Sequence, residues 1–247
     1  MELKGCTAIV TGGSGGLGQR ICCALALHGV DIVVNYAESE AKANSVAEDM
    51  IKLGVRSVAL CADVTDPRAV ARMVDEAQAA FGRVDILVND AAFNKTIAFA
   101  DIDGMTHELW SRIMNINLTG AFNCSKAVAP LMKAQGQGRI VNISSGAGVA
   151  PRGSSIAYAV SKAGMIHLTK CMAVALAPAV TVNSIAPGFM EGTRMSANWS
   201  PAYAAGAADR TLLRRTVDKD DVAEQLITFC RGDCVTGQTI LMDSGRV

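Results

Sequence analysis

Short apolar segments alternate with segments of helical periodicity along the whole chain. The strand-like segments are Cys6–Val10, Asp31–Asn35, Ser57–Cys61, Asp85–Val88, Gly138–Ser145, Val180–Ile185 and Gln238–Met242. Strands of a parallel sheet are buried on both faces and therefore have continuous apolar sequences, while the helices between them cover the sheet. The alternation predicts an α/β fold: a doubly wound parallel sheet of about seven strands with helices on both faces.

The composition indicates one globular domain without a strongly charged partner. Half of the 247 residues are hydrophobic, and no Pro/Ser-rich linker or charged run divides them, so we expect a single domain over residues 1–247. Lysine plus arginine equals aspartate plus glutamate, at 23 each, which predicts neither a nucleic-acid partner nor a membrane partner. Since the apolar segments are short, we expect no signal peptide, no transmembrane helix and a cytoplasmic location.

The eight cysteines lie mostly in apolar segments. They form no Cys-x-x-Cys pair, which favours buried free thiols. Cys230 and Cys234 resemble half of a metal-binding pattern, but no histidine follows them. We therefore predict no metal site.

A glycine-rich turn, Thr11–Gly18, directly follows the first strand and opens a helix that should run to about Leu27. Glycines let the backbone turn tightly and let a diphosphate approach the free N–H groups of the helix N-terminus. Such a turn can also be an ordinary loop. Its place between a strand and a helix favours a nucleotide site.

Tyr158, Lys162 and Ser145 indicate a proton-transfer site. On a helix, Tyr158 and Lys162 lie one turn apart on the same face. A phenol with a pKa of about 10 is a poor acid at neutral pH, and an ammonium group about 4 Å away would bring its pKa near 7. Ser145 ends a predicted strand, at the edge where parallel sheets hold ligands. The alternative is a core tyrosine with a solvated lysine and a serine that only forms a turn.

Two further segments stand out between these motifs. Asn117 lies inside a long predicted helix, His107–Ala134, where an asparagine favours a local opening or serves as a polar helix contact. The segment 189–210 is rich in Met, Ala, Gly and aromatic residues, which is typical of a lid over a substrate.

Several motifs occur together in one order. They are Thr-Gly-x-x-x-Gly-x-Gly at Thr11–Gly18, Asp63-Val64, Asn89-Asp-Ala-Ala92, then Asn117, Ser145, Tyr158 and Lys162, and finally Pro187-Gly188 with Thr193. Over nearly its whole length the chain resembles the classical short-chain dehydrogenase/reductases, and within them the branch of 3-oxoacyl carrier-protein reductases. The resemblance implies a single-domain Rossmann-type fold and an NAD(P)-dependent oxidoreductase that interconverts carbonyl compounds and secondary alcohols.

The resemblance also implies roles for individual residues. Tyr158 would exchange the proton with the substrate oxygen, Ser145 would polarise that oxygen, Lys162 would lower the pKa of the tyrosine, and Asn117 would hold a water. The cofactor-binding set would be Gly12, Ser14, Gly15, Gly16, Leu17, Gly18, Asn35, Tyr36, Asp63, Val64, Asn89, Ala91, Tyr158, Lys162, Pro187, Gly188 and Thr193.

The chain departs from the family pattern at several positions. Asp90 and Ala92 replace asparagine and glycine, Gly15 stands where a basic residue is common, and Gly192 is inserted before Thr193. No carboxylate ends the second strand at Asn35-Tyr36-Ala37, which favours NADP(H), with NAD(H) as the alternative because Glu38 lies near.

The substrate is predicted from the apolar character of the pocket walls. These walls should come from Ser145, Phe93, Ala147, Val149, Arg152, Phe189, Met190, Trp199 and Tyr203, which suit a small free carbonyl compound or alcohol. The ends of the two long helices, Ala134–Gly138 and Ala177–Ala179, are expected beside the entrance and lack the basic residues that an acidic carrier protein needs. A 3-oxoacyl carrier-protein reductase and a non-catalytic dinucleotide-binding sensor or scaffold remain the alternatives. The resemblance further implies a homotetramer.

Overall fold

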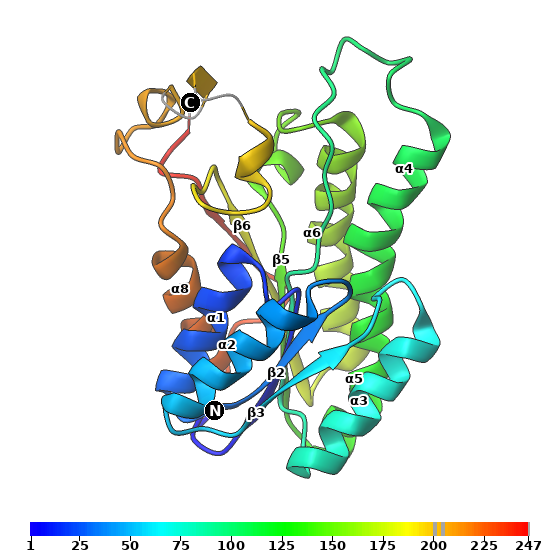
Figure 1. Ribbon diagram of the computed structural model, residues 1–247, viewed down its shortest axis with the longest axis vertical. Helices are drawn as coiled ribbons and strands as arrows, with labels where there is room; N and C mark the ends of the chain where they lie inside the picture. Colours follow the sequence, from blue (N-terminus) through cyan, green and yellow to red (C-terminus); the bar gives the residue numbers. More distant parts are fainter. Residues whose placement is uncertain (200–201, 204–205, 247) are drawn as a thin grey trace.

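The computed structural model describes residues 1–199, 202–203 and 206–246 (Figure 1). Its centre is one sheet with the strand order β3-β2-β1-β4-β5-β6-β7, in which every neighbouring pair is parallel. The strands are β1 (Thr7–Thr11), β2 (Asp31–Tyr36), β3 (Ser57–Cys61), β4 (Ile86–Asn89), β5 (Gly138–Ile143), β6 (Val180–Pro187) and β7 (Thr239–Met242). The predicted fold class is confirmed.

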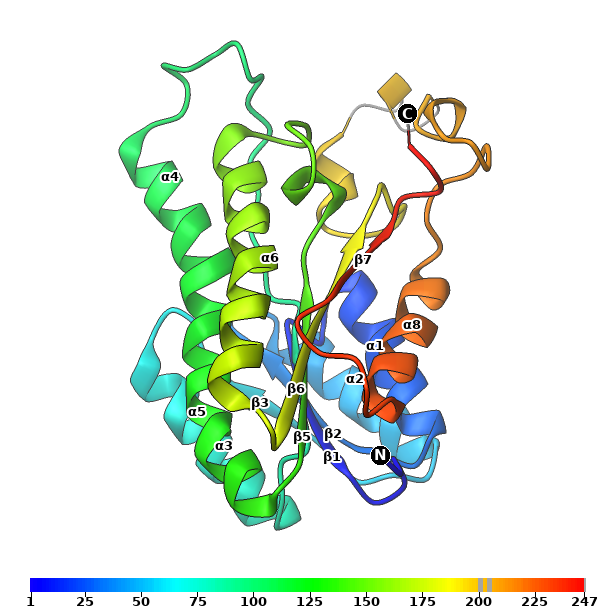
Figure 2. The same ribbon diagram turned by 180° about the vertical axis from the view of Figure 1, so that it is seen from behind.

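Helices cover both faces of this sheet (Figures 1 and 2). One face carries α1 (Gly16–Leu27), α2 (Glu40–Lys52) and α8 (Lys219–Arg231). The other carries α3 (Pro67–Phe81), α4 (His107–Met114), α5 (Gly120–Gln135) and α6 (Ile156–Leu176). Shorter helical turns are η1 (Asn115–Thr119), η2 (Gly146–Gly148), η3 (Ser196–Asn198) and η4 (Ala208–Arg210).

The central strands divide their side chains between two separate hydrophobic cores. Val10 and Val34 pack into the core under α1, α2 and α8, whereas Ile9 and Val33 pack into the core under α3, α5 and α6. Successive side chains of a strand point to opposite faces. A strand between two helical layers must therefore be apolar at every position, which is why the continuous apolar segments predict this sheet.

The long helix expected over His107–Ala134 contains a π-helical turn. The turn η1 separates α4 from α5 at Asn115–Thr119, and Asn117 at its centre is fully buried. The local opening expected at this asparagine is confirmed. Such turns are rare and occur often at functional sites.

The strand order reverses between β1 and β4, because β2 and β3 extend to one side of β1 and β4 to β7 to the other. In open parallel sheets the crevice at this reversal, at the carboxyl ends of the strands, is where ligands bind. The glycine-rich turn follows β1 at this edge, and Asp90 to Ala92 follow β4.

Two sequence-based expectations are wrong. The ends of α5 and α6 lie at the amino edge of the sheet, opposite the ligand-binding edge, because each leads into the start of the next strand (Figure 1). They therefore cannot form the cleft entrance of this protomer. Of the eight free cysteines, Cys61, Cys171 and Cys234 are exposed rather than buried.

In the described part of the chain, no helix has the length and apolarity needed to cross a membrane.

Candidate active site

A cavity of about 740 Å³ opens at the carboxyl edge of the sheet. It brings together most of the residues predicted for the cofactor and for catalysis: Gly12, Ser14, Gly15, Gly16, Leu17, Asn35, Tyr36, Asp63, Val64, Ala91, Ser145, Tyr158, Lys162, Pro187, Gly188 and Thr193. Most of the predicted substrate-wall residues line it too, namely Phe93, Ala147, Arg152, Phe189, Met190, Trp199 and Tyr203. The prediction is wrong for Val149, which is 54% exposed and lies outside the cavity lining. This volume lies within the range of about 300–1,000 Å³ that is typical of small-molecule and cofactor sites.

The glycine-rich turn is closely packed, and its glycines have different tasks. A Cβ atom at Gly18 would lie 2.5 Å from the carbonyl oxygen of Gly12, so Gly18 allows α1 to pack on the turn. A Cβ atom at Gly16 would lie 2.5 Å from the carbonyl oxygen of Gly192, in the segment that follows β6. Gly18 itself does not line the cavity, so the structure gives it a packing role.

Asn35, near the end of β2, was expected to contact the cofactor, but its side chain binds other parts of the protein. Asn35 is buried, and its Nδ2 donates to the carbonyl oxygen of Ala62 at 3.0 Å while its Oδ1 accepts from Gly12 N–H at 3.4 Å. Its side chain therefore ties β2 to the glycine-rich turn and to the end of β3. Ala37 and Glu38, which the sequence analysis considered for cofactor preference, line this end of the cavity. Three neighbours that sequence reasoning missed line it too: Ser39, Lys42 and Thr65. Their position directly after two strand ends was the available signal.

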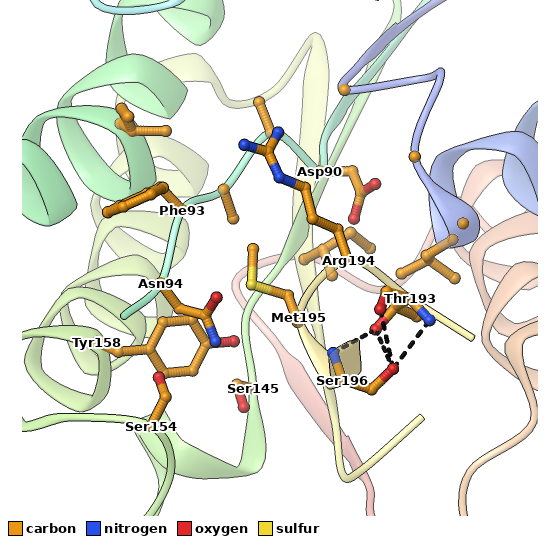
Figure 3. A pocket seen from close by; sticks show the side chains of 18 of the residues that line it. Asp90, Phe93, Asn94, Ser145, Ser154, Tyr158, Thr193, Arg194, Met195 and Ser196 are labelled. Carbon is orange, nitrogen blue, oxygen red and sulfur yellow. Dashed lines mark hydrogen bonds between the residues drawn. The ribbon is translucent and has the colours of Figure 1, made fainter. Parts of the chain in front are cut away.

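Tyr158 and Lys162 lie on one face of α6, and Ser145 follows β5 opposite them. Ser155 caps this helix by accepting from Tyr158 N–H at 3.2 Å. The Oγ of Ser145 accepts from Ala147 N–H at 3.1 Å, which begins η2. Figure 3 shows Ser145 and Tyr158 directed into the same cavity.

Lys162 is 2% exposed, and its Nζ donates to the carbonyl oxygen of Ile143 at 2.7 Å. The Nζ lies 5.8 Å from the centre of the Tyr158 ring. Burial raises the pKa of Tyr158, a hydrogen bond with Ser145 acts in the opposite direction, and the charge of Asp90 adds to the rise. The expectation that Lys162 brings this pKa near 7 is wrong for the chain alone, because burial dominates and the ammonium group is held by β5.

Asn117 is fully buried, and its side-chain amide makes three hydrogen bonds to protein groups. Its Nδ2 donates to the carbonyl oxygen of Phe93 and to Ser161 Oγ, both at 3.0 Å, and its Oδ1 accepts from Phe93 N–H at 2.7 Å. It does not line the cavity. The amide instead joins η1, the loop at Phe93 and α6, which fixes the wall beside Tyr158.

Asn89 also lies away from the cavity. Its Nδ2 donates to Asn142 Oδ1 at 2.8 Å and to Ser125 Oγ at 3.2 Å. The side chain thus joins β4, β5 and α5 beneath the ligand-binding edge. The prediction that it binds cofactor finds no support in its side-chain position.

The substrate side of the cavity has aromatic walls. Trp199 and Tyr203 are stacked with ring centroids 4.0 Å apart, and Phe189 meets Tyr203 edge-on at 5.6 Å. Phe93 lies under the guanidinium of Arg112, 4.2 Å from its ring centroid. These rings supply most of the apolar surface expected there.

Arginines form more of this wall than the sequence suggested. Arg112, Arg194 and Arg246 line the cavity together with Arg152. Arg152 donates to Asp243 at 2.8 Å, so its charge is already paired. Ser154 lines the cavity near Tyr158 (Figure 3), and its buried Oγ has no hydrogen-bond partner among the described residues.

Comparison with known proteins assigns the family. The model of the short chain dehydrogenase family matches residues 6–204. The chain belongs to the short chain dehydrogenases. It is 39% identical over 241 residues to a protein named as a ketoacyl reductase of the granaticin polyketide synthase from Streptomyces violaceoruber, covering 96% of this chain and 94% of that one.

A second relative and a solved structure also match this short chain dehydrogenase over nearly its whole length. A 3-oxoacyl-[acyl-carrier-protein] reductase from Synechocystis is 37% identical over 244 residues, covering 97% of this chain and 96% of the relative. The crystal structure of an NAD⁺-bound xylitol dehydrogenase superposes with a TM-score of 0.90 at 28% identity, covering 99% of this chain and all of the other. The chain is an NAD(P)-dependent oxidoreductase that interconverts a carbonyl compound and a secondary alcohol.

The residues present fit a nicotinamide dinucleotide. Gly15, Gly16 and Leu17 line the cavity, so the N-terminus of α1 is accessible to a diphosphate, and the same cavity extends to Ser39 and to Tyr158. Free N–H groups and the dipole of a helix N-terminus favour an anion. Gly12, Ser14 and Thr193 would hold the diphosphate, and Lys162 lies beneath the reactive end.

Proposed function

We propose that this short chain dehydrogenase reduces small, free carbonyl compounds with NADP(H), using Tyr158 as the general acid. The observation that carries the proposal is that Ser145, Tyr158 and the buried Lys162 line the same cavity, into which Ser145 and Tyr158 both point (Figure 3). The segment 189–210 serves as the lid over this cavity; its positions 200, 201, 204 and 205 lie outside the described residues.

Each side chain has a separate task in the proposed reaction. A nicotinamide dinucleotide held by Gly12, Ser14 and Thr193 would supply the hydride for the carbonyl carbon. The Tyr158 hydroxyl gives its proton to the carbonyl oxygen, so that the carbonyl becomes an alcohol and the tyrosine a phenolate. The Ser145 hydroxyl donates a hydrogen bond to the same oxygen, and the ammonium of Lys162 stabilises the phenolate. In the oxidation the same groups act in reverse.

Asn117 acts in this proposal by position. Its amide forms hydrogen bonds with Phe93 and Ser161. It therefore fixes the position of the substrate wall relative to α6, which carries Tyr158. The water-binding role that the resemblance implies would depend on the remaining lone pair of its oxygen or on backbone groups.

A second candidate is a reductase of carrier-bound acyl groups, which is the activity in the names of two relatives. The helix ends that argued against a carrier lie at the wrong edge of the sheet. Arg112 and Arg194, both exposed at the cavity, offer positive charge to an acidic partner. The aromatic walls and the paired Arg152 favour the free substrate.

Substrate specificity constants test this proposal directly. We expect a higher kcat/KM for free ketones and secondary alcohols than for 3-oxoacyl thioesters on a carrier protein, measured in the same salt concentration by the absorbance of the reduced nicotinamide. A strong preference for the carrier-bound substrate would establish the second candidate. Tight cofactor binding without turnover of any substrate would indicate a sensor or scaffold.

A further inference from the structure

Four arginines line the cavity: Arg112, Arg152, Arg194 and Arg246. Arg152 forms an ion pair with Asp243 at 2.8 Å. In the described part of the chain, no carboxylate pairs with the other three. Positive side chains without a counter-ion attract anions into a cleft. The cavity that holds the reacting groups therefore favours a negatively charged ligand.

Arg246 is the best fixed of the three arginines without a carboxylate partner. Arg112 and Arg194 are exposed, whereas Arg246 is half-buried. The backbone N–H of Arg246 donates to Asp243 Oδ1 at 3.2 Å, and its Nη1 donates to the hydroxyl of Tyr203 at 3.3 Å. A guanidinium carries several N–H donors in a rigid plane, so further donors of Arg246 remain for a ligand.

The tyrosine that accepts this hydrogen bond belongs to the aromatic wall. Its ring stacks on Trp199 and meets Phe189 edge-on. The guanidinium of Arg210 also lies over this ring, 4.8 Å from the centroid, and its buried Nε has no hydrogen-bond partner among the described residues. Two half-buried arginines thus contact Tyr203. Because half-buried cations are stabilised by a counter-ion, an anion bound here would be held firmly.

A series of contacts connects Arg246 with the reacting groups. Gly146 follows Ser145, and a Cβ atom at Gly146 would lie 3.2 Å from Arg152 Nη2. Arg152 pairs with the carboxylate of Asp243, which also accepts from the Arg246 N–H. Arg246 therefore lies on the same side of the cavity as Ser145. A substrate whose carbonyl oxygen is bound at Ser145 can extend to Arg246 within one cavity.

We propose that the substrate is a free oxo acid, or the corresponding hydroxy acid, whose carboxylate is bound by Arg246. This inference rests on the proposed function, because it concerns the second group of a substrate that is reduced at Tyr158. A guanidinium binds a carboxylate through two parallel N–H···O hydrogen bonds. The aromatic rings of Phe189 and Trp199 contact the carbon chain between the carbonyl group and the carboxylate.

The first test measures binding without turnover. The protein is saturated with NADP⁺ or NAD⁺, whichever binds more tightly, because an oxidised dinucleotide has no hydride to give to a ketone. Calorimetric titration compares levulinate, an oxo acid, with methyl levulinate, which has the same carbonyl group and no charge. We expect wild type to bind levulinate about tenfold more tightly, as for one hydrogen bond to a charged group. Equal affinities in wild type would overturn the proposal.

Variants of Arg246 test which cation binds the carboxylate. Arg246→Gln should bind levulinate and methyl levulinate equally, while Arg246→Lys should keep part of the preference because the charge remains. Arg215→Gln is the matched control, since Arg215 lies outside the cavity lining and pairs with Asp221 at 3.8 Å. The control should bind both compounds as wild type does. A full preference for levulinate in Arg246→Gln would assign the carboxylate to another cation and overturn the proposal.

Steady-state kinetics separates this inference from the proposed function. Arg246→Gln should lower kcat/KM for levulinate about tenfold, mainly through KM, because the lost contact is made in the ground state and the transition state alike. Reduction of neutral ketones together with equal kcat/KM for levulinate and its methyl ester would refute the role of Arg246 alone. Tighter binding of levulinate by a chain that reduces no carbonyl compound would support the anion site and refute the proposed function.

Discussion

At the scale of single residues, several polar side chains near this site form hydrogen bonds that join secondary-structure elements. Asn35, Asn89 and Asn117 each join two or three elements through side-chain hydrogen bonds. The family resemblance marked all three as functional, because they fall on positions of its motifs or its expected cofactor contacts. It could not show which ones reach the cavity, because that depends on side-chain direction at the strand ends.

Asn117→Ala should reduce the free energy of unfolding by about 2–4 kcal/mol, because three buried hydrogen bonds are lost and the Phe93 backbone is left unpaired. Asn123→Ala is the matched control, since Asn123 makes one hydrogen bond, to the carbonyl oxygen of Val64 at 3.0 Å. Its loss should cost about 1 kcal/mol. Equal urea-unfolding curves for the two variants would show that Asn117 does not join η1 to α6.

Cofactor preference is also decided by single residues. We expect a higher kcat/KM with NADPH than with NADH, because Asn35 is neutral and Lys42 lines the cavity near Ser39. Lys42→Ala should lower kcat/KM about fivefold for NADPH and leave NADH unchanged, as for one charge contact near the surface. Lys52→Ala, on the same helix but paired with Asp49, is the control. A clear advantage of NADH in wild type would contradict this preference.

At the scale of elements, the site depends on how η2 packs against α6. A Cβ atom at Gly148 would lie 2.5 Å from the carbonyl carbon of Lys162 and 2.8 Å from Ala163 N. Both contacts are with helical backbone, which cannot move aside cheaply. This contact sets the distance between Ser145 and Tyr158.

Gly148→Ala should therefore displace η2 or α6 and lower kcat by about 100-fold, the effect of a displacement of about 1 Å in a catalytic site. Cofactor affinity should change little, because the glycine-rich turn lies on another strand. Gly232→Ala provides the comparison, since its Cβ atom would make an ordinary contact of 3.4 Å with Thr228. Full activity of Gly148→Ala in steady-state kinetics would disprove the role of this packing.

The boundaries of most elements could be predicted from the sequence because periodicity and glycines mark them. The helix α3, for example, begins at Pro67 and ends before Gly82, whose φ of 81° favours glycine. The π-helical turn was signalled only by the asparagine at its centre. Phe93 was predicted as a wall residue, but its contact with Arg112 could not be, because it joins a helix to a loop of irregular sequence.

At the scale of the whole molecule, one sheet places every functional segment at the same edge. The order of the strands could be inferred from family resemblance, and the segments that follow β1, β4, β5 and β6 then converge on the cavity. The C-terminal ends of α5 and α6 were expected beside the cavity entrance. Each helix runs antiparallel to the strands, so these ends lie at the opposite edge of the sheet. The entrance therefore carries the positive charges of Arg112 and Arg194, whereas the sequence analysis expected no basic residues there.

The outer faces of α5 and α6 favour assembly of several copies. Phe122, Val160 and Val174 are 43%, 41% and 83% exposed, and exposed apolar side chains of this size suit an interface. We predict a homotetramer, measured as the mass by light scattering at micromolar concentration. Phe122→Glu should shift the mass towards smaller species. A monomeric wild-type mass would contradict the prediction.

Turnover of wild type and Tyr158→Phe tests the central claim most directly. With a carbonyl substrate and NADPH, the consumption of the reduced nicotinamide should be about 10²–10⁴-fold slower in Tyr158→Phe, the range expected for loss of a general acid. Binding of NADPH, followed by its fluorescence, should remain nearly unchanged because the ring keeps its packing. A Tyr158→Phe enzyme that retains most of the wild-type rate would contradict the account.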